Sequence, residues 1–252
     1  MNVYFVGAGP GDPELITVKA RRLLQNCKIC IYAGSLISPA VLSLLPEKAE
    51  KHDSAGMDLD EICAIYREAH DRDIDVIRLH SGDPSIYGAI REQMNELDKL
   101  GIGYEVVPGV SSFQASAAAL RTELTAPEVA QTIILTRTSG RTPVPDEQSL
   151  DALGRTQATL CIFLSAHKIG DVADTLSKHY GSRCPVAVVY HASWPDELVV
   201  RGVLEDIAGK LEATGIKKTA MIVVGKALSR EIPASLLYDP GFSHQYRIGK
   251  QR

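Results

Sequence analysis

The stretch VYFVGAGPGDPELIT, Val3 to Thr17, decides the fold. It begins with a β-branched and aromatic run typical of a buried strand, continues into a loop of glycines and prolines, and ends at a helix start. A strand, a glycine loop and a helix in this order are typical of the first unit of an α/β sheet. The functional question is which ligand fits the loop Gly7-Ala8-Gly9-Pro10-Gly11-Asp12.

The same alternation of strands and helices continues through the first half of the chain. Short apolar runs predict strands at residues 2–6, 28–33, 75–80 and 104–109. Between them, apolar residues at helical spacing predict helices at 17–27, 58–70 and 89–101. The alternation predicts a mostly parallel sheet with helices on its faces.

The predicted helices carry start and stop signals. Thr17 is a candidate N-cap, Asp58 and Glu61 have the spacing of a capping box, and Gly101 is a candidate C-terminal cap. Apolar residues near helical spacing are predicted to face inward; they are Val18, Leu23, Leu24, Leu59, Ile62, Ile65, Tyr66, Ala69, Ile90, Met94, Leu97 and Leu100.

The second half is predicted to form another α/β unit with more antiparallel pairing. Strands are predicted at 131–136, 158–164, 185–192, 197–204 and 219–225, and the third and fourth of them read as a hairpin. We therefore expect an N-terminal α/β domain over 1–113, a C-terminal α/β domain with a mixed sheet over 114–240, and a tail over 241–252.

Four loops of the first half are rich in glycine, proline and serine, and each follows a predicted strand. They cover residues 7–12, 33–38, 80–88 and 108–112. Ligands of parallel sheets bind beyond the carboxyl ends of the strands. The sequence therefore predicts a ligand site at this edge of the first sheet.

Composition excludes several classes of protein. The net charge is −4, from 27 basic and 31 acidic residues, so the general basic excess of a nucleic-acid binder is missing. No run approaches the roughly 20 apolar residues that span a bilayer. Strand-like residues begin at Val3, where a secretory leader would need a charged and then an apolar region. We expect a cytoplasmic protein without nucleic-acid or membrane partners.

The five cysteines do not predict a disulfide framework or a metal site. Their number is odd, and Cys27-x-x-Cys30 has no second pair of ligands to complete a zinc site. Buried structural thiols are the expectation. His80, His167 and His191 are not at the i, i+4 spacing of a helical metal site, so we expect hydrogen-bonded or packed histidines and no metal.

The first loop fails the test for a dinucleotide-binding turn. The sixth position of that fingerprint is Asp12 instead of glycine, and Pro10 lacks an N–H to offer a pyrophosphate. The second strand ends in Ala33-Gly34-Ser35, which supplies no carboxylate for a ribose. A plain tight turn is an alternative for this loop alone. The recurrence of Gly-Asp-Pro at residues 82–84, again after a predicted strand, favours a function.

Four segments together resemble a known family. VGAGPGDPELIT, HSGDPSIYG, VPGVSS and TAMIVVG occur in this order over residues 2–226 and are similar to motifs of the tetrapyrrole methyltransferases. The resemblance implies two α/β domains that bind S-adenosyl-L-methionine between them and release S-adenosyl-L-homocysteine. YAGSLIS (32–38) and HASWPDELVVRG (191–202) are most similar to the members that methylate precorrin-4 at C-11 in making the corrin ring of cobalamin.

The resemblance also implies a set of cofactor-binding residues. Pro10 would border the adenosine, and Ser81, Gly82, Asp83 and Ile86 would hold the methionine part and the ribose. Ser111 and Ser112 follow the fourth strand, and Leu164, Ala192 and Ala220 would close the pocket from the second half. Relatives commonly carry a methionine where this chain has Leu164, and either side chain gives an apolar wall.

Methyl transfer from a sulfonium needs alignment more than acid–base help, so no catalytic side chain is predicted. The carboxylates of a precorrin favour basic partners. The candidates are Lys19, Arg121, Arg137, Arg141, His167 and Lys168, and for each a solvated surface charge is the alternative. Trp194 is expected to cap the hairpin instead of stacking on a substrate.

Several alternatives stay open at this point. The substrate could carry cobalt, or the chain could be another tetrapyrrole methyltransferase, such as one acting on uroporphyrinogen III. A non-catalytic binding module and a methyltransferase for RNA or protein are further hypotheses. The intact glycine loops disfavour the former, and the charge balance disfavours the latter. The resemblance also implies a homodimer.

Overall fold

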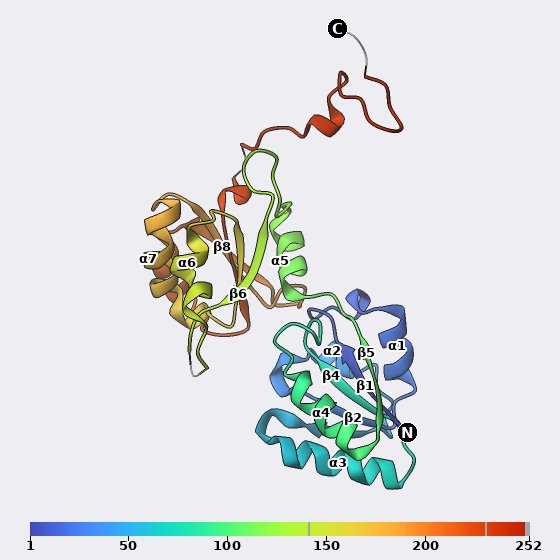
Figure 1. Cartoon of the computed structure of the whole chain (residues 1–252). Helices are drawn as coiled ribbons and strands as arrows, with labels where there is room; N and C mark the ends of the chain where they lie inside the picture. The colour runs from blue at the N-terminus through green and yellow to red at the C-terminus, as the bar shows by residue number, and fades with distance from the viewer. Residues whose placement is uncertain (141, 230, 250–252) are drawn as a thin grey trace. The chain divides into compact units, whose positions relative to one another are not determined.

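The computed structural model describes residues 1–140, 142–229 and 231–249 and contains two compact units (Figure 1). The first unit comprises Met1–Ser116 and His191–Glu197, and the second comprises Ala117–Tyr190 and Leu198–Arg252. The chain therefore passes from the second unit into the first and back again within one hairpin. Among the described residues, no helix is long and apolar enough to cross a membrane.

The first unit is built on a five-stranded sheet in the order β3-β2-β4-β1-β5, and every pairing is parallel. The strands are β1 (Asn2–Gly7), β2 (Ile29–Tyr32), β3 (Glu50–Asp53), β4 (Val76–His80) and β5 (Gly103–Val107). β4 is buried along its whole length, as expected of a strand covered on both faces. β3 is short and polar, which suits its place at the edge of the sheet.

Helices cover both faces of this sheet. They are α1 (Val18–Gln25), α2 (Pro39–Leu42), α3 (Leu59–Asp71) and α4 (Ile90–Leu100), with short 3-10 turns at Pro13–Leu15, Gly34–Leu36 and Ser54–Gly56. Leu24 of α1 and Val41 of α2 pack with Leu79 on one face. Tyr66 of α3 and Leu97 of α4 pack with Phe5 on the other.

The capping signals in the sequence are confirmed. The Thr17 hydroxyl accepts from Ala20 N, Asp58 and Glu61 form a reciprocal capping box, and Gly101 ends α4 in the left-handed conformation. The inward position of Val18 is wrong, because this side chain is 88% exposed. Leu23 and Leu24 lie five and six residues further on, and at 3.6 residues per turn neither spacing returns to the same helix face.

The second unit contains a five-stranded mixed sheet in the order β6-β7-β10-β8-β9. Its strands are β6 (Ile133–Arg137), β7 (Thr159–Phe163), β8 (Pro185–Tyr190), β9 (Leu198–Val203) and β10 (Ala220–Val224). β6 and β7 pair in parallel, whereas β8 pairs antiparallel with both β9 and β10. The hairpin expected from the sequence is therefore β8–β9.

Three helices of the second unit are α6 (Leu150–Gly154), α7 (Ile169–Tyr180) and α8 (Ile207–Glu212). Leu176 of α7 and Ile207 of α8 pack against the sheet in one apolar cluster. α5 (Ser112–Leu120) runs from the first unit into the second, and short 3-10 turns lie at Asp146–Gln148, Ala166–Lys168, Lys226–Leu228 and Leu236–Tyr238. All five cysteines are buried free thiols, as expected.

Candidate functional site

The four glycine-rich loops of the first unit follow β1, β2, β4 and β5, which are neighbours in one parallel sheet. Their strands therefore deliver all four loops to the same edge. The backbones of the β1 and β4 loops are joined directly, because Gly82 N donates to Gly9 O at 2.9 Å and Ala8 N donates to His80 O at 2.7 Å. The sequence expectation that these loops come together is confirmed.

Three glycines let the loops after β1, β4 and β5 pack backbone against backbone. A Cβ on Gly7 would lie 2.6 Å from Gly109 Cα, and a Cβ on Gly109 would lie 2.8 Å from Gly7 Cα and overlap the Gly82 carbonyl oxygen. Gly82 also has a left-handed backbone, with φ +64°. The glycines are needed here mainly because larger residues would push the loops apart.

Asp83 locks the β4 loop to the β5 loop. One carboxylate oxygen accepts from Gly109 N at 2.9 Å, and the other accepts from Ser85 N at 2.8 Å and from the Ser85 hydroxyl. Burial by itself would raise the pKa of Asp83, but the hydrogen bonds from Ser85 and Gly109 lower it below its ordinary value. An ionised carboxylate has about four acceptor positions, so Asp83 keeps capacity for one more donor.

Side chains from two other segments hold the first glycine loop. The Ser38 hydroxyl donates to Gly11 O at 2.6 Å, Trp194 Nε1 donates to Pro10 O at 2.8 Å, and Asp12 N donates to the Ser193 hydroxyl at 3.1 Å. The indole lies where a side chain on Gly11 would be. Trp194 therefore secures the loop, a role beyond the hairpin cap expected from the sequence.

The contacts of the first loop also bear on the dinucleotide alternative. The amides of Ala8, Gly9 and Asp12 donate to protein acceptors, and Pro10 has no N–H. A pyrophosphate site needs several loop amides aimed at the ligand. These three amides already donate hydrogen bonds to other parts of the protein, which disfavours a phosphate ligand at this loop.

The segment that carries Trp194 has a fixed conformation of its own. The His191 ring stacks on the indole with centroids 4.3 Å apart, and His191 Nδ1 lies 3.0 Å from Asp196 Oδ1. Ser193 N donates to Glu197 Oε2 at 2.7 Å. These contacts explain how His191 and Ser193 keep left-handed backbones, with φ 46° and 70°.

The expected cofactor-binding residues divide between the two units. Around the loops of the first unit, Ser81 is exposed, Pro10, Asp83, Ile86 and Ser112 are half-buried, and Gly82, Ser111 and Ala192 are buried. In the second unit, Leu164 follows β7 with 63% of its surface exposed, and Ala220 begins β10 half-buried. The structure thus brings eight of them, Pro10, Ser81, Gly82, Asp83, Ile86, Ser111, Ser112 and Ala192, into one unit.

Three of the six basic candidates for binding substrate carboxylates already have partners within the protein. Lys19 pairs with Glu105, and Lys168 Nζ donates to Ser139 O at 2.7 Å. The Arg137 guanidinium donates to the carbonyls of residues 138, 142 and 143. Arg121 and His167 are exposed, and Arg141 lies outside the described residues.

A buried polar cluster beside the β4 loop was missed from the sequence. Tyr66 OH donates to Gln93 Oε1 at 2.8 Å, Arg78 Nε donates to the same oxygen at 3.1 Å, and Gln93 Nε2 donates to Ala89 O at 3.1 Å. Within the described residues, Arg78 Nη1 and His80 Nε2 have no hydrogen-bond partner. A polar residue at position 93, between the inward positions 90 and 97 of α4, was the available signal.

His80 links this cluster to the pH dependence of folding. Burial, together with the nearby Arg78 charge, lowers the pKa of His80 to about 3. In the unfolded chain the imidazole takes up a proton as the pH falls through about 6.5. Between these values the unfolded state binds more protons, so the free energy of unfolding should fall with falling pH by up to about 1.4 kcal/mol per unit.

We expect His80→Gln to flatten this pH dependence, because glutamine does not titrate. Urea unfolding of both chains between about pH 7 and pH 5 measures the two slopes, in the range where an ordinary histidine titrates. In the wild-type chain, the NMR resonances of the His80 ring should also stay unshifted over this range. A ring that titrates near its ordinary pKa would contradict the prediction.

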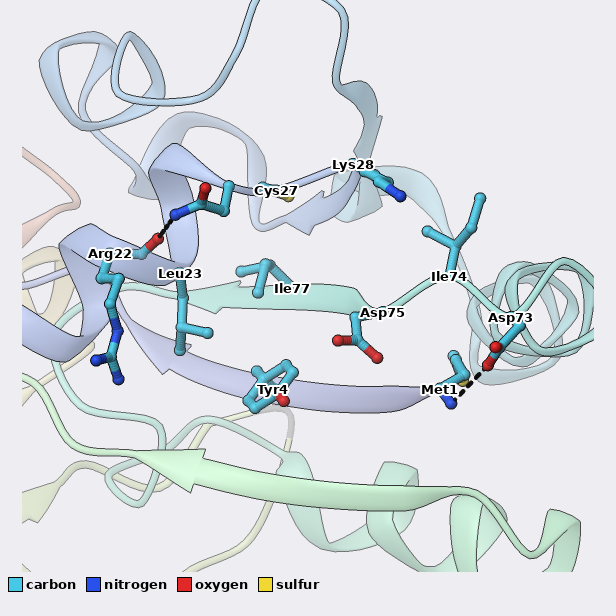
Figure 2. A pocket seen from close by; sticks show the side chains of 11 residues that line it. Met1, Tyr4, Arg22, Leu23, Cys27, Lys28, Asp73, Ile74, Asp75 and Ile77 are labelled. Atoms are coloured by element: carbon cyan, nitrogen blue, oxygen red, sulfur yellow. Dashed lines mark hydrogen bonds and ion pairs between the residues drawn. The ribbon is translucent and has the colours of Figure 1, made fainter.

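A separate hollow of about 570 Å³ lies at the amino ends of β1 and β4, away from the loops (Figure 2). Three of its charged groups are engaged, because the Met1 amine pairs with Asp73 at 2.9 Å and Asp75 accepts from Asn2 N at 2.7 Å. Among the described residues, no group of three His, Cys, Asp or Glu side chains is placed to hold a metal ion.

Comparison with known proteins places these features in a family. The model of the tetrapyrrole (corrin/porphyrin) methylases matches residues 2–208. A cobalt-precorrin-4 C(11)-methyltransferase of Methanocaldococcus jannaschii is 51% identical over 97% of this chain and 95% of its own. A precorrin-4 C(11)-methyltransferase of Pseudomonas aeruginosa is 49% identical over 99% of this chain and 100% of its own. The chain belongs to the tetrapyrrole methylase family.

Solved structures agree with this assignment. A cobalt precorrin-4 methyltransferase of cobalamin biosynthesis has a TM-score of 0.88 and 43% identity, covering 90% of this chain and 96% of that one. A uroporphyrin-III C-methyltransferase from Thermus thermophilus, complexed with S-adenosyl homocysteine, has a TM-score of 0.76 and 32% identity, covering 90% and 93%. The expected fold, with a parallel N-terminal and a mixed C-terminal α/β sheet, is confirmed.

Proposed function

We propose that this chain methylates precorrin-4 at C-11 with S-adenosyl-L-methionine as the methyl donor, a step of cobalamin biosynthesis. The observation that carries the proposal is near-complete alignment, at about half identity, with enzymes named for this reaction. The substrate is precorrin-4 either without or with cobalt in the ring, because relatives named for each form align about equally well.

We propose that the loops of the first unit hold the cofactor. The supporting observations are the hydrogen-bonded loop assembly and the lowered pKa of Asp83, which keeps that side chain charged at neutral pH. A carboxylate with one acceptor position left fits an ammonium group, and the half-buried Pro10 and Ile86 fit the less polar parts of the ligand. The places of Leu164 and Ala220 in the cofactor site stay predictions from the resemblance.

The cofactor supplies a methyl group on a good leaving group. The task left to the chain is to hold the reactants in line, which is worth on the order of 7 to 11 kcal/mol of the barrier when alignment is good. The loop assembly suits this task, since the Asp83 hydrogen bond to Gly109 N and the close packing of the three glycines hold the loop backbones together. No side chain is assigned as a base.

The proposal is tested by binding and by product analysis. Calorimetry should detect S-adenosyl-L-homocysteine binding to the wild-type chain. Incubation with S-adenosyl-L-methionine and either metal-free or cobalt-bearing precorrin-4 should add one methyl group at C-11, seen by mass and NMR. A folded chain that leaves both substrates unmethylated, or that methylates another ring carbon, would contradict it.

We also propose a homodimer, as the resemblance implies, and a cytoplasmic location, as the apolar pattern of the sequence indicates. Light scattering after gel filtration would measure the mass of the assembly. A monomer at micromolar concentration would count against the dimer.

A further inference from the structure

The β4 loop enters α4 through an unfavourable backbone conformation. Tyr87 and Ala89 both have left-handed backbones, with φ 55° and 48°. Ala89 is also the N-cap of α4, and the methyl side chain of an alanine cannot form a capping hydrogen bond. Non-glycine residues in this conformation cost of order 1 to 3 kcal/mol each and persist only where their surroundings fix them.

One buried side chain contacts this strained segment from inside the unit. Gln93, only 4% exposed, lies one turn into α4 and donates to Ala89 O at 3.1 Å. Its other amide atom, Oε1, accepts from Tyr66 OH and from Arg78 Nε, so the amide cannot rotate freely. The orientation of the amide is thus set by a tyrosine of α3 and an arginine of β4.

The strained segment is the second end of the loop that carries the proposed cofactor residues. Asp83 fixes the first end through Gly109 and Ser85. The loop then folds back sharply, since a Cβ on Gly88 would overlap the Pro84 carbonyl. Residues 84–88 therefore lie between two anchors, the Asp83 carboxylate and the Gln93 amide.

We propose that Gln93, oriented by Tyr66 and Arg78, is a positioning residue that holds the β4 loop in its cofactor-binding conformation through Ala89. The inference rests on the proposed function for the identity of the ligand. Gln93 itself is buried and does not touch the ligand; it acts through the carbonyl of Ala89.

The Gln93→Glu variant tests whether the hydrogen bond to Ala89 O positions the β4 loop, apart from any effect on the stability of the fold. The glutamate keeps the acceptor for Tyr66 and Arg78 and adds a negative charge beside a buried guanidinium that lacks a partner at Nη1 within the described residues. It removes the donor to Ala89 O and sets a carboxylate oxygen against that carbonyl. We expect a free energy of unfolding near that of the wild type, with S-adenosyl-L-homocysteine bound about tenfold more weakly.

Two further variants complete the test by calorimetry. Ala89→Gly in the Gln93→Glu background should restore most of the affinity, because glycine adopts the left-handed conformation without strain. Glu92→Gln, a reciprocal change at an exposed neighbour on α4, should leave the affinity unchanged.

The outcomes are distinct. Unchanged affinity in Gln93→Glu, failure of Ala89→Gly to restore it, or a Gln93→Glu chain that does not fold would each overturn this inference alone. Failure of the wild-type chain to bind S-adenosyl-L-homocysteine would overturn the proposed function together with it.

Discussion

Gly109→Ala is expected to abolish most cofactor binding. The new Cβ would overlap the Gly82 carbonyl oxygen and lie 2.8 Å from Gly7 Cα, and both are backbone atoms that a rotamer change cannot move. The β5 loop must then shift, which separates Gly109 N from Asp83. Overpacking of this kind costs roughly 1 to 3 kcal/mol of stability. The affinity for S-adenosyl-L-homocysteine should fall more than about tenfold, or 1.4 kcal/mol.

Gly209→Ala is the matched control. Gly209 lies in α8, and within the described residues a Cβ there would meet nothing within 4 Å. Alanine is favoured over glycine in a helix by roughly 0.5 to 1 kcal/mol, so this variant should be as stable as the wild type or more so. Calorimetry measures the affinity of each variant for S-adenosyl-L-homocysteine, and urea unfolding measures its free energy of unfolding. A Gly109→Ala chain that binds like the wild type would show that the close approach is not required.

Asp83→Ala should weaken both the fold and cofactor binding. It removes the acceptor of hydrogen bonds from Gly109 N, Ser85 N and the Ser85 hydroxyl, and leaves the β4 and β5 loops without this link. Hydrogen bonds to a charged group are worth about 1.5 to 3 kcal/mol, so a stability loss of that order is expected. Affinity for S-adenosyl-L-homocysteine should fall at least about tenfold, because the proposed ammonium partner is lost as well.

Asp206→Ala provides the comparison for this second variant. The Asp206 carboxylate likewise accepts from a backbone amide, Val203 N at 2.9 Å, and from a side chain, Lys210 Nζ at 2.7 Å, but it lies in the second unit. The Asp206→Ala change should lower the free energy of unfolding and leave the affinity for S-adenosyl-L-homocysteine unchanged. Asp83→Asn should be intermediate, since it keeps one acceptor oxygen. Equal affinity in Asp83→Ala and the wild type would remove Asp83 from the proposed site.

Much of the first unit could be predicted from sequence because its signals are local. Apolar runs predicted β1, β2, β4 and β5, and the capping-box spacing of Asp58 and Glu61 predicted the start of α3. β3 was missed because its residues, Glu50–Asp53, are polar and lack a strand pattern. The loops were located because glycine and proline restrict backbone geometry whatever the surroundings.

The tertiary part of the site could not be predicted in the same way. Gln93 is buried by partners on α3 and β4, and a helix pattern says only that position 93 faces inward. The segment 191–197 joins the first unit through contacts with residues 10–12, which lie more than 180 positions away. Nothing local in a hairpin loop encodes such a partner.

The position of Trp194 has a practical consequence. It is the single tryptophan of the chain, and its indole touches Pro10 and Gly11 in the first glycine loop. Intrinsic fluorescence excited at the indole band therefore comes from one residue, at the place where the adenosine is expected to bind. A change in Trp194 fluorescence should therefore report ligand binding at the first glycine loop, without an attached dye.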